Sequence, residues 1–267
     1  MSGARPADTH DFSSAGYRGI LARAQALGYS LQCFSGFIPP AEQPVLLLRH
    51  DLDHSLRAAL PLAELEAQCK VRSTYFVQVT CDFYNVLGRE GRAVIAGLVK
   101  LGHEIGLHYD ARRYAAVLQS GGRAAAEARL RLDLALVEDL AGQPVISASQ
   151  HLPCDTEGFD VRCAVQNEAY EDRFTAGSMA YISDSLLAWR QATPHDLLDR
   201  RASFQLLTHP VKWGAPAAQL HDVLQRALRE ECDALRAHYE EVEAYYAGLL
   251  ERRAELDAAF RSRCAGR

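Results

Sequence analysis

Short apolar runs alternate with amphipathic segments along most of this chain, and no other feature of the sequence restricts the fold as strongly. Runs typical of buried strands lie at 45–48, 73–79, 103–108, 145–149 and 204–208. Helical periodicity separates several of them, at 58–69, 93–101 and 123–140. Strands that alternate with helices predict a parallel sheet, either open or closed into a barrel. Reactive groups on both kinds of sheet lie beyond the carboxyl ends of the strands, so polar residues at those ends are candidates for a site.

A different pattern begins near residue 217. Apolar residues there recur at steps of three, four or seven, with no proline and with only Gly248 as a helix breaker. This predicts one long helix, or two helices broken near Gly248. We therefore predict an α/β barrel over residues 1–215 and a helical extension, a long helix or a helical hairpin, over 216–267. The extension is expected to pack on the barrel or on a second copy of itself, which would make the protein a homo-oligomer.

Composition excludes several classes of protein. The formal net charge is −5, whereas nucleic-acid-binding proteins usually carry a basic face, so no nucleic acid is expected as a partner. No apolar stretch approaches the roughly 20 residues that span a bilayer, and the N-terminus lacks the apolar run of a signal peptide. The seven cysteines are scattered and include no C-x-x-C pair, so no redox motif or zinc knuckle is indicated. We expect a cytoplasmic protein with reduced thiols and no transmembrane segment.

Two aspartates end the first of these strands, in the segment R-H-D-L-D-H at 49–54. Because strand side chains alternate, Asp51 and Asp53 point to one side and His50 points to the other. Two adjacent carboxylates repel each other unless a cation or a proton lies between them. A metal ion would relieve this repulsion, and one carboxylate could then bind it while the other accepts a proton from water. The alternative is a helix-capping aspartate next to a surface aspartate.

A second motif, G-H-E-I-G-L-H-Y-D, covers residues 102–110. On a strand, Glu104 and His108 share a side, and His103 lies on the opposite side. His108, at the end of the strand, is therefore the candidate metal ligand. His103, at the start of the strand, is expected to be structural.

These two motifs, separated by a helix, a strand and another helix, resemble those of the polysaccharide deacetylase family, the NodB-like carbohydrate esterases of family 4. The similarity covers about residues 46–213. Members are distorted (β/α) barrels that remove N- or O-acyl groups with a divalent metal, usually zinc. The resemblance implies the same distorted (β/α) barrel and a divalent metal here, with Asp51 as general base and with Asp53 and His108 as metal ligands.

One position departs from the family pattern. The family usually has a second metal-binding histidine four residues after the first, and Arg112 stands there in this chain. Arginine stays protonated and offers no lone pair, so it cannot bind the metal. Zinc normally has three protein ligands. His151, which directly follows the strand at 145–149, is the best replacement, and Asp110 is the alternative.

The strand at 204–208 ends in His209, which resembles the final motif of the family. The histidine of that motif protonates the leaving amine, and the resemblance implies the same role for His209. Amide hydrolysis needs such an acid, because an unprotonated amine is a poor leaving group. The alternative is a histidine that only caps the strand.

The segment 181–190 resembles the part of the family that places an Arg or Asp next to the catalytic residues. Asp184 and Arg190 are candidates for that role, and Trp189 could stack on a sugar ring. These three residues are the expected substrate contacts.

The combined features predict a metal-dependent carbohydrate deacetylase, which hydrolyses a C–N bond other than a peptide bond. The expected substrate is an acylated amino sugar, linked to a nucleotide or a lipid, from surface polysaccharide or lipopolysaccharide biosynthesis. Two alternatives stay open. One is a deformylase or cyclic-amide hydrolase on the same fold, and the other is a non-catalytic sugar- or metal-binding relative, which the missing family histidine favours.

Overall fold

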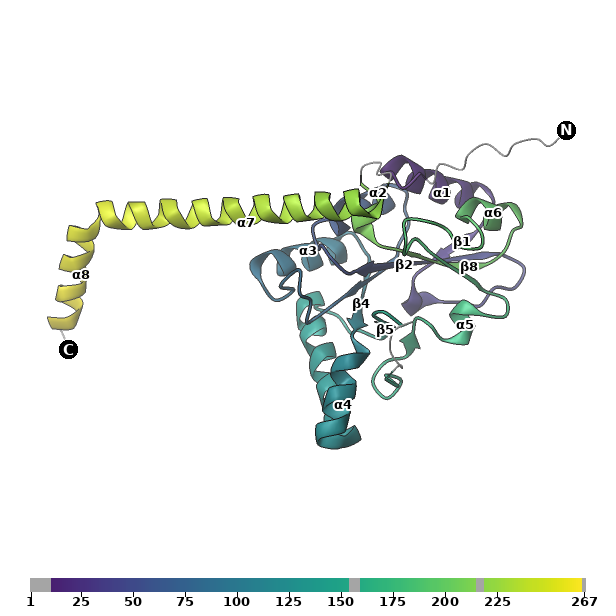
Figure 1. Cartoon of the computed structure of the whole chain (residues 1–267), viewed down its shortest axis with the longest axis horizontal. Helices are drawn as coiled ribbons and strands as arrows, with labels where there is room; N and C mark the ends of the chain where they lie inside the picture. The colour runs from purple at the N-terminus through teal and green to yellow at the C-terminus, as the bar shows by residue number, and fades with distance from the viewer. Residues whose placement is uncertain (1–10, 154–158, 215–218, 266–267) are drawn as a thin grey trace. The chain divides into compact units, whose positions relative to one another are not determined.

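A parallel β-sheet forms the centre of the protein. The computed structural model describes residues 11–153, 159–214 and 219–265, and Figure 1 shows its elements. In these residues eight parallel strands form one sheet in the order β6-β5-β4-β3-β2-β8-β7, with β1 paired to β2 outside this path. The strands are β1 (Ser30–Gln32), β2 (Val45–Leu52), β3 (Thr74–Val77), β4 (Glu104–Tyr109), β5 (Ser147–Gln150), β6 (Asn167–Glu168), β7 (Ala180–Ser183) and β8 (Phe204–Thr208).

Helices follow most of these strands and return the chain for the next parallel one. They are α1 (Ser14–Ala26), α2 (Ala59–Gln68), α3 (Arg89–Lys100), α4 (Ala111–Ala141), α5 (Asp172–Thr175) and α6 (Pro194–Asp199), with short 3-10 helices η1 (Phe34–Gly36) and η2 (Pro210–Lys212). Among the described strands, β6 and β7 end the order, so the barrel is distorted and not closed by a continuous ladder. The predicted α/β fold with a distorted (β/α) barrel is confirmed.

The inner face of the sheet changes from apolar to polar along β2. Val45 and Leu47 pack in an inner cluster with Phe34, Phe76 and Phe174. Farther along the same face, the buried side chains are charged. Because alternate residues of a strand share a face, the inner face of β2 is apolar and packed at its start and polar at its carboxyl end.

Gly106 of β4 shows how closely this interior is packed. A Cβ atom at Gly106 would lie 2.4 Å from the Phe76 ring and 3.0 Å from the carbonyl oxygen of Ser147. The second motif therefore needs glycine at this position for steric reasons, two residues before His108.

Three strands, the short helices α5 and α6, and part of helix α4 were not predicted. β1, β6 and β7 have only two to four residues and no distinct apolar run. Helix α4 was expected to begin at residue 123, but it begins at Ala111 and contains a break at Gly122, where φ is 76°. The helix ends at Ala141, one residue from the predicted end at 140, and Gly142 follows in the left-handed conformation with φ 63°.

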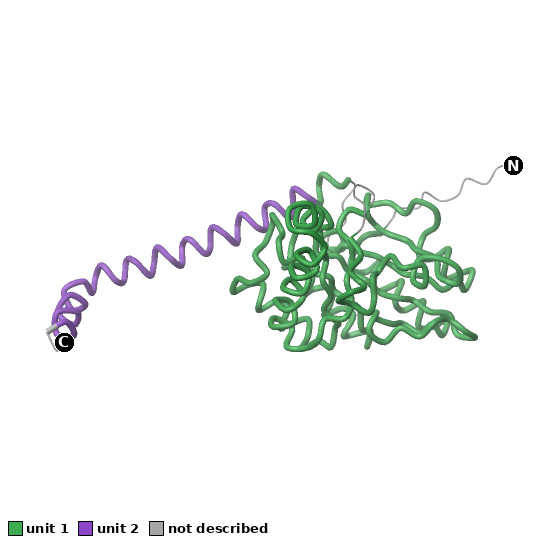
Figure 2. Tube along the Cα trace, turned by 90° about the horizontal axis from the view of Figure 1, so that it is seen from below, with its two compact units in different colours: residues 1–223 green, residues 224–267 purple. Residues whose placement is uncertain are grey.

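The chain divides into two compact units after Val223 (Figure 2). The second unit contains most of helix α7 (Leu220–Glu251) and all of helix α8 (Arg253–Ala265). Two helices form, as one of the two predictions stated, but the break comes at Arg252, and Gly248 lies inside α7. No described helix has the length and apolarity needed to cross a membrane.

Candidate metal centre

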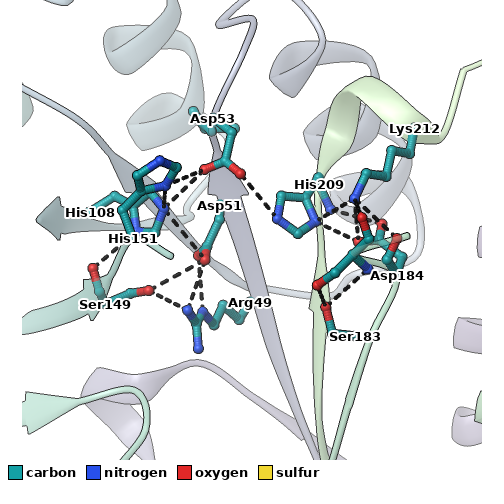
Figure 3. Close-up of polar contacts among 12 residues, drawn as sticks. Arg49, Asp51, Asp53, His108, Ser149, His151, Ser183, Asp184, His209 and Lys212 are labelled. Carbon is teal, nitrogen blue, oxygen red and sulfur yellow. Dashed lines mark hydrogen bonds and ion pairs between the residues drawn. The ribbon is translucent and has the colours of Figure 1, made fainter. Parts of the chain in front are cut away.

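Asp53, His108 and His151 meet at the carboxyl edge of the sheet (Figure 3). Asp53 follows β2, His108 lies in β4, and His151 follows β5. One Asp53 oxygen, Oδ1, lies 3.0 Å from His108 Nε2 and 3.3 Å from His151 Nδ1, and these two nitrogens are 3.2 Å apart. Because three donor atoms from three chain segments lie within 4.8 Å of one another, they can bind one ion together.

The chemistry of these three groups fits a divalent cation. His108 Nδ1 lies 3.0 Å from the carbonyl oxygen of Ser149, to which it can donate only as N–H. This hydrogen bond leaves the lone pair of Nε2 facing Asp53, as is usual for a histidine ligand. Burial raises the pKa of Asp53, but the imidazoles of His108, His151 and His209, which donate to its carboxylate when they are protonated and no ion is bound, hold that pKa well below its ordinary value. One ionised carboxylate and two imidazoles form a ligand set typical of zinc.

Asp51 lies next to this group but is bound mainly by an arginine. Its Oδ2 is 3.7 Å from His108 Nε2, so it lies on the same side of β2 as Asp53. Arg49 donates from Nε to Oδ1 at 2.9 Å and from Nη2 to Oδ2 at 2.8 Å. Burial raises the pKa of Asp51, but the charge of Arg49, followed by that of His108, lowers it below its ordinary value. Asp51 is therefore an ionised carboxylate at the edge of the candidate centre.

Arg49 also belongs to the site, although no sequence motif indicated it. Its side chain is fully buried, with its guanidinium carbon 4.4 Å from the ring centre of Tyr170. It also donates to Gln205 Oε1 at 3.0 Å and to the hydroxyl of Ser149. Residues 49 and 51 have the same parity, so strand alternation indicated that their side chains share a face. The other partners of Arg49, however, come from β5, β8 and the segment after β6.

His209 approaches Asp53 from the opposite side to His108 and His151, the two candidate ligands (Figure 3). Its Nε2 lies 3.3 Å from Asp53 Oδ2, and its Nδ1 donates to Asp184 Oδ1 at 2.5 Å. Burial lowers the pKa of His209, but the charge and hydrogen bond of Asp184 and the hydrogen bond with Asp53 together raise it to about 9. His209 is therefore protonated at neutral pH, with Nε2–H directed toward the centre.

Asp184 is fully buried and contacts protein groups. It accepts hydrogen bonds from the backbone N–H of His209 at 2.9 Å and from Trp213 Nε1 at 2.7 Å, and Lys212 Nζ lies 3.4 Å from it. Burial raises its pKa, and His209 and Lys212 lower it below the ordinary value. Asp184 thus lies next to His209, the candidate acid, orients its imidazole and favours its protonated form. Asp184 does not face open solvent.

The other candidate residues lie apart from this centre. The carboxylate of Asp110 caps helix α4 and is held by Arg112, with Nη2 at 2.7 Å, and it does not belong to the three-residue group. The Trp189 ring stacks on Phe12 with ring centres 5.5 Å apart, which covers one of its faces. Arg190 is exposed and lines a shallow pocket with Tyr181 and Ser183. His103, expected to be structural, is buried and lies 3.1 Å from the carbonyl oxygen of Ala63 through Nε2.

No family model matches this chain, and no curated protein matches it. Several solved structures are similar to it. A chitin deacetylase from the fungal pathogen Colletotrichum lindemuthianum has 17% identity over 73% of this chain and 85% of its own, with a TM-score of 0.43. A family 4 carbohydrate esterase from Bacillus anthracis has 18% identity over 83% and 86%, with a TM-score of 0.39. A CE4 family pseudoenzyme from the same organism has 13% identity over 75% and 66%, with a TM-score of 0.38. At these identities, the chemistry of the site has to be inferred from its own side chains.

Proposed function

We propose that this protein is a metal-dependent hydrolase that removes an N-acyl group from an amino sugar, and that this acyl group is acetyl. The convergence of Asp53, His108 and His151 between an ionised Asp51 and a protonated His209 carries this proposal. An acceptor and a donor of protons on either side of a cation site is the arrangement that amide hydrolysis requires.

Asp53, His108 and His151 would hold the ion, and zinc suits these ligands best. A divalent ion held there would supply a Lewis acid and would make water acidic enough to lose a proton near neutral pH. Asp51 accepts the proton that water loses as it attacks the acyl carbonyl. Arg49 keeps the carboxylate of Asp51 ionised and fixes its rotation, because it binds both oxygens.

His209 completes the reaction on the other side of the centre. Its Nε2–H donates a proton to the nitrogen of the leaving amine, which then departs as a neutral group. Asp184, at Nδ1, keeps the imidazole charged until this step and orients it. The products are a carboxylic acid and a free amino sugar.

We further propose that the substrate is a nucleotide- or lipid-linked amino sugar used in surface polysaccharide or lipopolysaccharide synthesis, and that the protein acts in the cytoplasm. Two of the similar structures are a chitin deacetylase and a family 4 carbohydrate esterase, which supports a carbohydrate substrate. A deformylase or a cyclic-amide hydrolase would use the same groups. The released acid distinguishes these reactions, because they yield acetate, formate or no free acid.

A non-catalytic relative is the second candidate, because Arg112 stands where the family has a ligand and a similar structure is a CE4 family pseudoenzyme. The two candidates are separated by an assay of acid release from a panel of acylated amino sugars, with zinc-loaded protein and with chelator-treated protein. We expect release that stops on chelation and returns with zinc. Stoichiometric zinc without any release across the panel would favour the non-catalytic candidate.

A further inference from the structure

Helix α7 carries a continuous row of apolar side chains at regular spacing. The row has alternating steps of four and three residues and consists of Leu228, Cys232, Leu235, Tyr239, Val242, Tyr246 and Leu249. These steps repeat every seven residues, with an average of 3.5 residues per turn. That period is typical of coiled coils, whereas a single amphipathic helix on a globular core follows 3.6.

The row is exposed to solvent. The exposed fractions are 55% for Leu228, 58% for Leu235, 64% for Tyr239 and 59% for Tyr246. None of the described residues from Leu228 to Cys264 is buried. Helices gain most of their stability from packing an apolar face, and a large exposed apolar surface marks an interaction site.

We propose that this row, the α7 face, pairs with the α7 face of a second copy of the chain in a two-stranded coiled coil. The face spans three heptads, which is near the lower limit for a stable coiled coil. A twofold pair is self-complementary, so a single exposed stripe suffices to close the assembly.

Charges that flank the row also fit a second copy. In a parallel pair, Glu231 lies beside the partner's Arg236, and the apolar Tyr245 lies beside the partner's Leu250. In an antiparallel pair, Arg236 lies beside the partner's Glu243. Either orientation brings opposite charges together at the edges of the apolar seam.

The opposite face of α7 does not fit a membrane surface. It carries five acidic residues, namely Glu230, Asp233, Glu240, Glu241 and Glu251. Helices that lie on membranes carry Lys and Arg on their polar face, because the lipid surface is anionic. The acidic face favours a protein occupant for the row, and the matching edge charges identify that occupant as a second copy.

Light scattering coupled to size exclusion tests this proposal on the full chain. Leu235→Glu with Tyr239→Glu adds two charges to the α7 face, and Ala237→Glu with Ala244→Glu adds the same charges to the outer face of the same helix. We expect twice the chain mass for the natural protein and for the control pair, and the single-chain mass for the first pair. A monomeric natural protein at micromolar concentration, a dimer that survives the first pair, or equal dissociation of both pairs would overturn the proposal.

Thiol cross-linking gives a second test that does not depend on dissociation. Cys232 is exposed on the row, so it can be kept while Cys154, Cys163 and Cys264 are replaced by serine. A short bifunctional maleimide should join two copies through Cys232 in a parallel pair, or through Cys232 and an added Leu249→Cys in an antiparallel pair. Ala237→Cys with Cys232→Ser is the control on the outer face. Cross-linking of this control as readily as the row, or no cross-linking of the row in either design, would contradict the pairing.

Discussion

Arg49 and Asp51 lie two residues apart on β2, and the guanidinium of Arg49 donates one hydrogen bond to each oxygen of the Asp51 carboxylate. Side chains two residues apart on a strand share a face, so a single strand delivers the candidate base together with its counter-ion. This planar pairing fixes the rotation of the carboxylate as well as its charge. It leaves Asp51 beside the candidate metal ligands without making it one of them.

Replacement of Arg49 by lysine should keep the charge but lose the two parallel hydrogen bonds. We expect kcat to fall by about 10- to 100-fold, because an ammonium group does not fix the carboxylate plane. The pKa of Asp51 should rise, so the acidic limb of the kcat/KM profile should move to higher pH. Arg57→Lys, in an exposed pair with Glu90, is the control. An unchanged rate and pH profile in Arg49→Lys would mean that Arg49 only packs the interior.

Replacement of Asp51 by asparagine should separate metal binding from turnover. The substitution removes the proton acceptor but leaves Asp53, His108 and His151 in place, so the zinc content should stay at that of the natural protein. Turnover should fall by about 1000-fold, the usual contribution of a positioned general base. A variant that keeps nearly full activity would show that another group accepts the proton.

Replacement of Asp184 by asparagine should weaken the candidate acid. Without the carboxylate, the pKa of His209 falls from about 9, so the basic limb of the pH profile should move to lower pH. Loss of acid catalysis should slow an N-acyl amino sugar far more than an activated aryl ester, whose leaving group needs no proton. Equal losses on the two substrates would assign Asp184 a structural role alone.

Glu66 should make the folded state sensitive to acid. It is fully buried and accepts hydrogen bonds from Tyr17, Tyr75 and Ser73, with His50 Nε2 at 2.9 Å. Burial raises its pKa, but the charge and hydrogen bond of His50, followed by His103 and Ser73, together lower the pKa from 4.5 to about 2. A carboxylate with a depressed pKa stabilises the fold above its unfolded pKa, and this contribution is lost as the pH falls from 4.5 toward 2.

Glu66→Gln should therefore lower the free energy of unfolding near neutral pH by roughly 3 kcal/mol, and the deficit should shrink as the pH falls through this range. Urea unfolding at a series of pH values measures this. Glu64→Gln, at an exposed position of the same helix, should leave the free energy nearly unchanged. A deficit for Glu66→Gln that does not vary with pH would contradict the assignment of the lowered pKa.

The sequence predicted the inner face of the barrel well, because strand alternation is a local property. Asp51, Asp53 and His108 lie on the side that parity predicted, and the carboxyl edge collects them as parallel topology requires. The position of His151 followed from its place directly after β5. The positions of these residues could be predicted because they depend only on where each strand begins and ends.

Other features depend on contacts that are distant in the sequence. The pairing of Arg49 needs Ser149 and Gln205, which come from strands about 100 and 156 residues away. Trp189 is an aromatic residue of the kind that can stack on a sugar ring, but Phe12, which is distant from it in the sequence, packs against it. The short strands β1, β6 and β7 carry too few residues for a period to be visible.

The metal content of three proteins tests the central claim most directly. The natural protein, His151→Ala and Asp110→Ala are stripped with chelator, loaded with zinc, dialysed and assayed by elemental analysis. We predict stoichiometric zinc in the natural protein and in Asp110→Ala, and a large loss in His151→Ala, because His151, unlike Asp110, shares the centre with Asp53 and His108. Full occupancy in His151→Ala with a loss in Asp110→Ala, or no bound zinc in the natural protein, would contradict it.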